Sequence, residues 1–377
     1  MKKVLIVGPT PPEGSYIGGI GIMLKGITGN WSSKSTKLIY LNSETRQRDF
    51  SITGRFGFST LKYSLVLLSR VLRKVKEERP DIIHFHSSWG AALLKDLLIS
   101  LICKVCYSCK LVFHIHYADL NAILLPRSRF LKAVQINLLY RCCDNVILMA
   151  DLVQEGFLSI APSIASRIRD RSVVLRNFTI ISDKHRGGPS DDYKRILFLG
   201  NIGRRKGAFD IIEACSVIRD QIEAQHVLLT FAGPFDSAEV ELEFKNLIKK
   251  SGLTASCILP GSVLGQEKEQ LFLDSDLFLL PSYAEGVPIA MLEAMSYGLP
   301  VIVSTEGGMP EVVINNEHGL LVSAGDISAL SGAISMLIDN HERRVFMGNQ
   351  GRKLIEREYS LNSYLERLDK VYQGLVA

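Results

Sequence analysis

Two glutamates lie eight residues apart in the segment SYAEGVPIAMLEAMSYGLP, which covers residues 282–300. Glu293 stands among apolar residues in a stretch that predicts a helix without a polar face. A buried carboxylate without donors is costly, so it is neutralised or paired. Two adjacent hydroxyls, such as those of a ribose, would satisfy it without a metal ion. Glu285 follows a predicted strand, beside Gly286, which permits close approach. The segment predicts a nucleotide or sugar site; a helix-start charge and a glutamate solvated by chance are the alternative.

A second candidate site is the loop in FLGNIGRRKGAFDIIEA, where Arg204, Arg205 and Lys206 precede a helix expected to begin near Gly207. Three cations at a helix N-terminus oppose the helix dipole and are unfavourable on structural grounds alone. A bound phosphate group with two negative charges would make them favourable. We expect a phosphate site here, with a solvated basic turn as the alternative.

Glycines cluster after the first predicted strand, in GPTPPEGSYIGGIGIMLKG. The strand end lacks the G-x-G-x-x-G fingerprint of dinucleotide-binding folds. Gly18, Gly19 and Gly21 come instead where the next helix should begin. Glycines at this position let backbone N–H groups approach an anion closely. The pattern indicates contact with a phosphate or a sugar, and a flexible turn is the alternative.

Short apolar runs alternate with helical patterns along the chain. Helices are expected at 59–79, 90–108, 128–142 and 361–376, and strands at 3–7, 37–41, 81–85, 110–116, 145–149, 172–176, 195–200, 226–233, 257–261, 276–282, 300–304 and 319–322. Strands apolar on both faces and joined by helices favour parallel sheets covered on both sides. The rhythm restarts after the polar stretch 182–194, an expected linker. The fold class is therefore α/β, with two Rossmann-like doubly wound domains and ligands in the cleft between them.

Composition limits the class of protein. A chain of 377 residues with 47% hydrophobic and 22% charged residues is typical of a globular protein with two domains. No run reaches the roughly 20 apolar residues of a membrane span, and the N-terminus favours a strand over a signal peptide, so a cytoplasmic location is expected. The seven cysteines fit a reducing compartment. Cys103, Cys106 and Cys109 have a spacing that favours semi-buried helix residues over a metal cluster.

The net charge is divided unevenly between the halves. Residues 1–180 contain 25 Lys or Arg and 12 Asp or Glu, while residues 181–377 contain 19 and 27. The first half is thus strongly basic, and it contains two candidate amphipathic segments, 59–79 and 126–141. The first combines Leu65, Leu68 and Leu72 with several cations. We expect an anionic membrane surface as a partner, with packing of both segments on their own sheet as the alternative.

The glutamate segment also carries a resemblance to a family. EGVPIAMLE, preceded by LFLLPS and followed by AMSYGLPVIVSTEGGMPEVV, resembles family 4 of the retaining nucleotide-sugar glycosyltransferases, or glycosyl transferases group 1. FLGNIGRRKG, FAGP and GLLVSAGD extend the resemblance, and IGGIG, DIIHFHSSWG and LVFHIHYAD continue it into the first half. It implies the GT-B fold, with an acceptor-side domain of residues 1–180, onto which 361–377 crosses back, and a nucleotide-sugar donor domain of residues 190–360.

The resemblance implies roles residue by residue. Glu285 binds sugar hydroxyls of the donor, Glu293 binds the ribose and Lys206 binds the diphosphate. His116 is the histidine near the transferred sugar, so the catalytic set is His116, Glu285 and Lys206. The full set implied for the donor is Gly18, Gly19, Arg204, Arg205, Lys206, Glu285, Gly286, Val287, Pro288 and Glu293. Pro288 is expected at the first helical position.

One departure from the family pattern and three neighbouring histidines matter for these roles. Asn201 stands where the family usually has an arginine, and Arg204 or Arg205 is the expected substitute. His84, His86 and His114 also lie near strand ends, where they are expected to be structural or supporting residues.

The implied reaction moves a sugar from a UDP- or GDP-sugar to an acceptor hydroxyl with retention at the anomeric carbon. The acceptor is a saccharide or, as expected here, a lipid-linked saccharide in cell-surface polysaccharide synthesis. No cofactor or metal is expected, because Lys206 and neighbouring cations can stabilise the leaving diphosphate. A front-face route in which the leaving phosphate acts as base is favoured, without a protein nucleophile. The alternatives are a nucleotide-sugar 2-epimerase, a non-catalytic partner subunit and a nucleic-acid binder, for which no recognisable motif is present.

Overall fold

The structure is a computed structural model that describes residues 1–10, 19–44, 58–87, 91–116, 128–184 and 193–375. The chain divides into two compact units: unit 1 is Met1–Asn177 with Leu361–Ala377, and unit 2 is Phe178–Ser360. Each unit contains a six-stranded sheet in which the paired strands are parallel. The strands of the described part match the predicted apolar runs within two residues at each end, which confirms the α/β fold class.

Unit 1 orders its strands β2-β1-β3-β4-β5-β6. Its elements are β1 (Lys2–Gly8), α1 (Gly19–Asn30), β2 (Thr36–Asn42), α2 (Phe58–Glu78), β3 (Ile82–Ser87), α3 (Ala91–Cys106), β4 (Lys110–Ile115), α4 (Arg129–Cys142), β5 (Asn145–Leu148), α5 (Asp151–Ile160), η2 (Pro162–Ile164), α6 (Ala165–Arg171), β6 (Ser172–Val174) and α14 (Leu361–Leu375).

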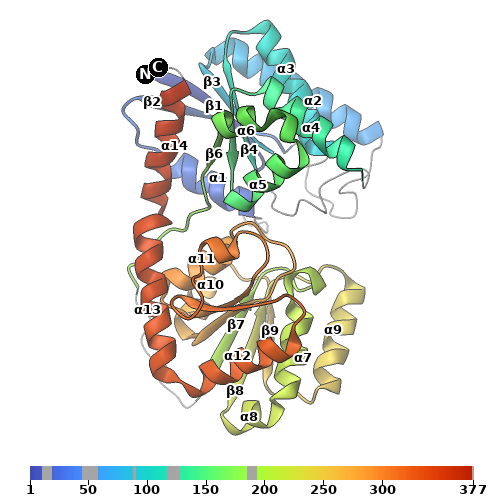
Figure 1. Cartoon of the computed structure of the whole chain (residues 1–377), viewed down its shortest axis with the longest axis vertical. Coiled ribbons are helices and arrows are strands. Elements are labelled where there is room, and N and C mark those ends of the chain that lie inside the picture. The colour runs from blue at the N-terminus through green and yellow to red at the C-terminus, as the bar shows by residue number, and fades with distance from the viewer. Residues whose placement is uncertain (11–18, 45–57, 88–90, 117–127, 185–192, 376–377) are drawn as a thin grey trace. The chain divides into compact units, whose positions relative to one another are not determined.

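Helices cover both faces of this sheet (Figure 1). One face packs against α2 to α6 in a single apolar cluster that includes Leu67, Phe113 and Phe157. The other face is covered by α1 and α14, and there Tyr364 of α14 donates a hydrogen bond to the Met23 sulfur of α1. The apolar runs of β1, β3 and β4 are buried because both of their faces are covered.

The C-terminal helix α14 is anchored to unit 1 by polar and aromatic contacts. The Asp369 carboxylate accepts hydrogen bonds from the hydroxyls of Ser33 (2.8 Å) and Thr36 (2.7 Å) at the start of β2. Tyr372 is fully buried, and its ring lies 5.8 Å from the ring of Trp31. The last helix therefore completes the cover over the α1 face of the first sheet.

Unit 2 orders its strands β12-β11-β10-β7-β8-β9 around its own core. Its elements are β7 (Lys194–Leu199), η3 (Arg204–Lys206), α7 (Ala208–Val217), α8 (Arg219–Ala224), β8 (Val227–Ala232), α9 (Ala238–Lys250), β9 (Cys257–Gly261), α10 (Gly265–Asp274), β10 (Leu277–Leu280), α11 (Ile289–Ser296), β11 (Val301–Ser304), η4 (Met309–Glu311), β12 (Gly319–Val322), α12 (Ile327–Asp339) and α13 (His341–Glu358).

Some expectations from the sequence need correction. The chain between β5 and β6 forms α5 and α6, which no prediction included. Helix α3 ends at Cys106, so Cys109 lies outside the helix that was expected to carry all three cysteines. Across the described residues, no helix has both the length and the apolar character needed to cross a membrane.

Candidate functional site

The first candidate site lies at the carboxyl edge of the unit 2 sheet, where β7 and β10 are neighbours. The chain runs from β7 to β8 and β9 on one side and then crosses to β10 on the other side. Ligands of doubly wound sheets bind at the carboxyl ends of strands where the strand order reverses in this way. The cationic segment follows β7 and Glu285 follows β10, so the two segments singled out in the sequence flank this point.

Backbone contacts fix these two loops against each other. The Arg205 carbonyl accepts hydrogen bonds from the Tyr283 N–H (2.9 Å) and the Ser282 hydroxyl (3.0 Å). Gly207 has a φ of +74° and lies so close to the Pro281 carbonyl that a Cβ would overlap it. A residue other than glycine would suffer both backbone strain and this clash. The loop after β10 can therefore dock only because Gly207 has no side chain.

The docked loops bring the Glu285 carboxylate to two of the three predicted cations. Its Oε1 contacts the Lys206 ammonium, the Arg205 Nη1 at 3.1 Å and the Ser282 hydroxyl at 3.5 Å. The side chains of Glu285 and Lys206 are only 15% and 19% exposed. All three partners contact Oε1, so Oε2 keeps its capacity to accept hydrogen bonds.

A third loop supports Glu285 from β11. The N–H of Gly308 donates to the carbonyls of Glu285 (3.3 Å) and Gly286 (3.0 Å). Gly307 has a φ of +65°, and a Cβ there would overlap the Glu285 carbonyl. The Glu285 backbone is thus held between segments that follow three adjacent strands, β7, β10 and β11.

Glu293 lies on α11 and has a partner that the sequence did not suggest. Lys268 of α10 contacts its Oε1 at 2.6 Å, and the side chains are 17% and 24% exposed. The sequence predicted ligand hydroxyls as the partners of Glu293 and not this cation, which comes from the separate helix α10. The second oxygen, Oε2, makes no hydrogen bond to the described residues. It can therefore still accept hydrogen bonds from two hydroxyls.

The other predicted donor residues differ in their surroundings. Arg204 pairs with Glu243 of α9 and lies over the Phe209 ring, so it does not join the Glu285 group. The Asn201 amide donates to Asp236 at 3.4 Å. The Val287 side chain is 1% exposed and belongs to the core. Pro288 is the residue before α11 rather than its first residue.

The second candidate site is a group of four histidines in unit 1. His84 and His86 of β3 and His114 of β4 are buried, and His116 directly follows β4. The parallel register pairs His86 with His114, so their side chains lie on the same face of the sheet. The contact of His84 with Tyr372 of α14 identifies this face as the one covered by α1 and α14. The His86 Nδ1 lies 2.8 Å from the His116 Nε2, and the His84 Nδ1 lies 2.6 Å from the Tyr372 hydroxyl.

Burial keeps these rings neutral. Removal from water lowers the pKa of His84 to about 3, and the neighbouring His116 contributes in the same direction. The pKa values of His86 and His114 fall well below their usual range, first through burial and then through the other histidines. Burial also lowers the pKa of His116. Neutral rings can donate from one nitrogen and accept at the other, as proton transfer and ligand binding require.

The glycine-rich loop is only partly within the described residues. Gly18 lies outside them, and Gly19 is the first residue of α1. Sequence reasoning missed two features of the sites, namely the contact of Lys268 with Glu293 and the assembly of all four histidines. The H-x-H spacing in both HFH and HIH was a usable signal, because alternate residues of a strand share a face.

Comparisons with known proteins agree with this architecture. The family described as Glycosyl transferases group 1 matches residues 180–354, and that described as Glycosyltransferase Family 4 matches residues 32–168. The chain is 23% identical over 315 residues to the sulfoquinovosyl transferase SQD2 of Arabidopsis thaliana, covering 80% of this chain and 58% of that protein.

A second relative is the GDP-mannose-dependent alpha-(1-6)-phosphatidylinositol monomannoside mannosyltransferase of Mycobacterium tuberculosis, 25% identical over 186 residues. That match covers 48% of this chain and 47% of the relative, so the chain spans about half the length of these two relatives. The crystal structure of HepE from Anabaena with UDP has a TM-score of 0.75 at 18% identity, covering 99% of this chain and 100% of HepE. That likeness shows the GT-B fold.

The buried histidines predict that unit 1 loses stability in mild acid. Their folded pKa values lie below the unfolded value of about 6.5, so the unfolded state binds more protons between the two. The contribution of the neutral histidines to the free energy of unfolding is fully present above a pH of about 6.5. It falls as the pH drops below that value, by up to about 1.4 kcal/mol per pH unit for each histidine. Tryptophan fluorescence during denaturant unfolding reports this, because Trp31 and Trp89 both belong to unit 1.

The measurement is made in EDTA between pH 8 and pH 5. The slope of the unfolding free energy against pH measures the protons taken up on unfolding. His114→Leu should reduce this uptake by about one proton, whereas His341→Leu, at an exposed position in unit 2, should leave it unchanged. A stability of unit 1 that does not change between pH 7.5 and pH 5.5 would contradict the neutral burial of these rings.

Proposed function

The chain is a family 4 glycosyltransferase with the GT-B fold, and we propose that it transfers a sugar from a UDP- or GDP-sugar to an acceptor hydroxyl with retention at the anomeric carbon. The observation that carries this proposal is the group formed by Lys206, Arg205 and Glu285 where the strand order reverses. Cations and an acceptor oxygen side by side suit a donor that presents a diphosphate next to sugar hydroxyls.

Lys206 and Arg205 bind the donor diphosphate in this proposal. Negative charge builds on the leaving diphosphate as the sugar bond breaks, and cations already in place stabilise that charge without reorganisation. The Oε1 of Glu285 contacts both cations. Arg205, and not Arg204, takes the place of the arginine that Asn201 replaces, because Arg204 is held by Glu243.

The two glutamates bind hydroxyls of the donor. Glu285 accepts hydrogen bonds from the transferred sugar, and Glu293 accepts those of the ribose, each with the Oε2 that its cationic partner does not contact. HepE has been solved with UDP and with UDP-glucose, which supports a nucleotide-sugar donor for this chain as well. The mannosyltransferase relative is named as GDP-mannose-dependent, so UDP-sugars and GDP-sugars are both candidate donors.

His116 acts at the transferred sugar, and the leaving phosphate acts as the base for the acceptor hydroxyl. The neutral His116 ring accepts or donates a hydrogen bond at Nε2 to His86, which fixes its orientation. No protein group is assigned as a nucleophile, and the cations of unit 2 take the role that a divalent metal has in other transferases.

The acceptor is a lipid-linked saccharide at an anionic membrane surface in this proposal. Helix α3 exposes Leu98, Leu101, Ile102 and Val105, whose i, i+3, i+4, i+7 spacing places them on one apolar stripe. The adjacent α4 exposes Phe130, Leu131, Val134 and Leu138, and α2 exposes Leu65 and Val66. We call these ten side chains the apolar surface of α2–α4. Patches of this kind mark interaction sites for membranes or proteins.

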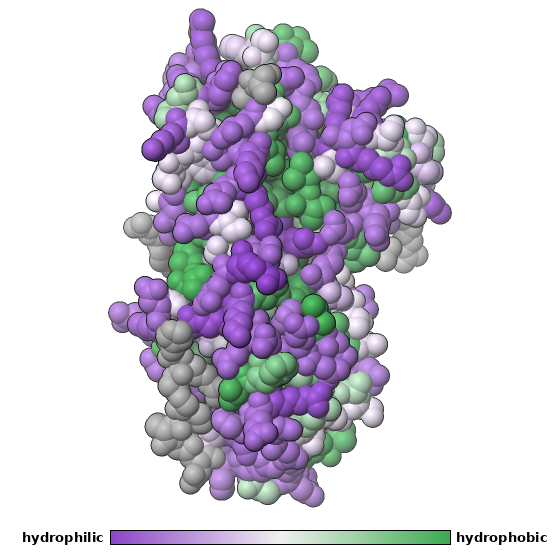
Figure 2. All heavy atoms as spheres, turned by 60° about the vertical axis from the view of Figure 1, so that its left-hand side comes forward, coloured by the Kyte–Doolittle hydropathy of each residue, from purple (hydrophilic) through white to green (hydrophobic). Residues whose placement is uncertain are grey.

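The apolar surface of α2–α4 differs from the sequence-based expectation for α2. Leu68 and Leu72 pack against the core of unit 1, and of the three predicted leucines Leu65 alone is exposed. Exposed cations flank the surface on the same helices, among them Arg73, Lys76 and Arg141. The face turned to the viewer in Figure 2 is, by contrast, mostly hydrophilic. The name of the mannosyltransferase relative contains phosphatidylinositol monomannoside, a lipid, and this supports a lipid acceptor for the chain.

Removal of the Lys206 charge tests the proposed donor site. Lys206→Met should lower kcat by about 10²–10³, the scale for the loss of one preorganised charge stabiliser. Arg204→Met is the matched control from the same turn, and it should retain activity within a few-fold because Arg204 contacts Glu243. Turnover is followed as nucleoside diphosphate release with a panel of nucleotide sugars. Equal losses in both variants would contradict the assignment.

Liposome binding tests the proposed acceptor surface. The protein should sediment with anionic liposomes at low salt, less at high salt, and little with neutral liposomes, since each cation near an anionic surface contributes about 1 kcal/mol and is screened by salt. The double variant Leu98→Ser with Val105→Ser should bind less, because both side chains are more than 60% exposed. Val217→Ser, at an apolar position of unit 2 that is 65% exposed, is the control. Equal recovery in the supernatant with both lipids at low salt would refute a membrane acceptor.

A further inference from the structure

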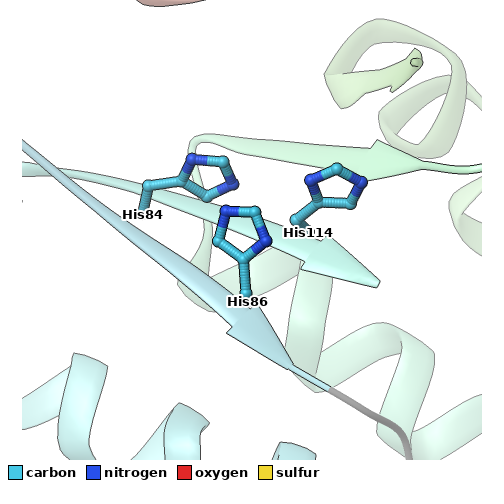
Figure 3. Close-up of side chains that lie close together, drawn as sticks. All are labelled: His84, His86 and His114. Atoms are coloured by element: carbon cyan, nitrogen blue, oxygen red, sulfur yellow. The ribbon is translucent and has the colours of Figure 1, made fainter. Parts of the chain in front are cut away.

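Three buried histidines of unit 1 gather their ring nitrogens in one place. His84 and His86 point to the same side of β3 because they are two residues apart, and His114 lies beside His86 on β4. One nitrogen from each ring can be chosen so that all three lie within 4.8 Å of one another. Figure 3 shows the three rings side by side on one face of the two strands. Two neighbouring H-x-H segments in parallel register thus build a compact cluster of imidazoles.

The nitrogens that face this cluster lack partners among the described residues. His84 Nε2, His86 Nε2 and both nitrogens of His114 are buried without a hydrogen bond there. Buried polar atoms without partners are unusual and costly in folded proteins, so four of them in one cluster call for a ligand. The ligand must bind several nitrogen lone pairs at once.

The remaining hydrogen bonds of the cluster match those of metal-binding histidines. His84 Nδ1 is bonded to the Tyr372 hydroxyl and His86 Nδ1 to His116, so in both rings Nε2 is the nitrogen left over. A histidine that binds a metal through one nitrogen usually donates from the other to a fixed acceptor, which sets its tautomer and orientation. Tyr372 and His116 are positioned to be those acceptors.

We propose that His84, His86 and His114 bind one late first-row divalent ion, with Zn²⁺ as the best match. Neutral imidazoles suit zinc, copper and nickel, and three protein nitrogens leave a fourth position for water or an anion. Zn–N bonds of about 2.0–2.1 Å place tetrahedral ligand nitrogens about 3.3 Å apart, so the rings close inward by at most about 1.5 Å. This site belongs to unit 1, and no part in the transfer chemistry is assigned to the ion.

Occupancy of the site has a consequence for His116, which rests on the proposed function of that residue. An ion on His86 Nε2 leaves the ring proton on Nδ1, which then donates to His116 Nε2. His116 would carry its own proton on Nδ1. The bound ion therefore selects one tautomer of the histidine proposed to act at the transferred sugar.

Metal titration of the full chain tests the site independently of activity. The protein is stripped with EDTA, titrated with Zn²⁺ by calorimetry, and analysed for bound metal after dialysis; Co²⁺ absorption reports the coordination geometry. We expect one equivalent of Zn²⁺ per chain, a higher unfolding temperature in the tryptophan signal of unit 1, and Co²⁺ bands typical of four-coordinate nitrogen sites. His114→Leu should weaken binding at least 100-fold, and His84→Gln serves as a second variant should the first fail to fold.

The control variant addresses the cysteines, which also bind zinc. Cys106 is exposed on α3, so Cys106→Ser should leave the stoichiometry and affinity unchanged. Less than 0.2 equivalents bound at micromolar Zn²⁺, unchanged affinity in the folded histidine variants, or loss of binding in Cys106→Ser would overturn the proposal. Because none of these readouts involves sugar transfer, a failure here is separate from a failure of the proposed transferase function.

Discussion

The close packing of Gly207 against the Pro281 carbonyl is the constraint on which the proposed donor site of unit 2 depends. It allows the loop after β10 to dock on the turn after β7, where the Arg205 carbonyl accepts two hydrogen bonds from that loop. Docking then brings the Glu285 carboxylate to Lys206 and Arg205. Glu285 lies 80 residues after Arg205 in the chain, so no local preference could bring it to the two cations. The glycine fixes the geometry, and the charged residues use it.

In both units the candidate site lies where the strand order of the sheet reverses. In unit 1 the strand order reverses between β1 and β3, and β3 carries His84 and His86. In unit 2 it reverses between β7 and β10, where the cations and Glu285 lie. The chemistry differs because the residues differ: unit 1 offers neutral rings buried under α14, whereas unit 2 offers charged groups that reach solvent. Tyr372 of the last helix directly contacts the histidine group, so the C-terminus of the chain contributes to the first unit.

Sequence patterns were sufficient for the fold and for part of the site. Strands that are apolar on both faces and bounded by turns were identified within two residues at each end, because burial leaves few other residue types there. The spacing of Glu285 and Glu293 predicted two residues of the donor site that we propose. The partner of Glu293 could not be foreseen, since Lys268 lies on a separate helix whose packing depends on the whole core. The outward faces of α3 and α4 were equally hidden, because apolar residues on a helix do not reveal which of them pack inside.

Calorimetric titration of UDP and GDP into the full chain and Glu293→Ala tests the central claim, which is that unit 2 binds a nucleoside diphosphate through this group. The native chain should bind one of the two nucleotides at one site, and Glu293→Ala should weaken it by about 10- to 150-fold, equivalent to about 1.5–3 kcal/mol for hydrogen bonds to a charged group. The variant should stay folded because the Lys268 side chain reaches solvent. Glu243→Ala, which removes the partner of Arg204, should bind as the native chain does. Unchanged nucleotide affinity in Glu293→Ala, or no binding of either nucleotide by the native chain, would contradict the account.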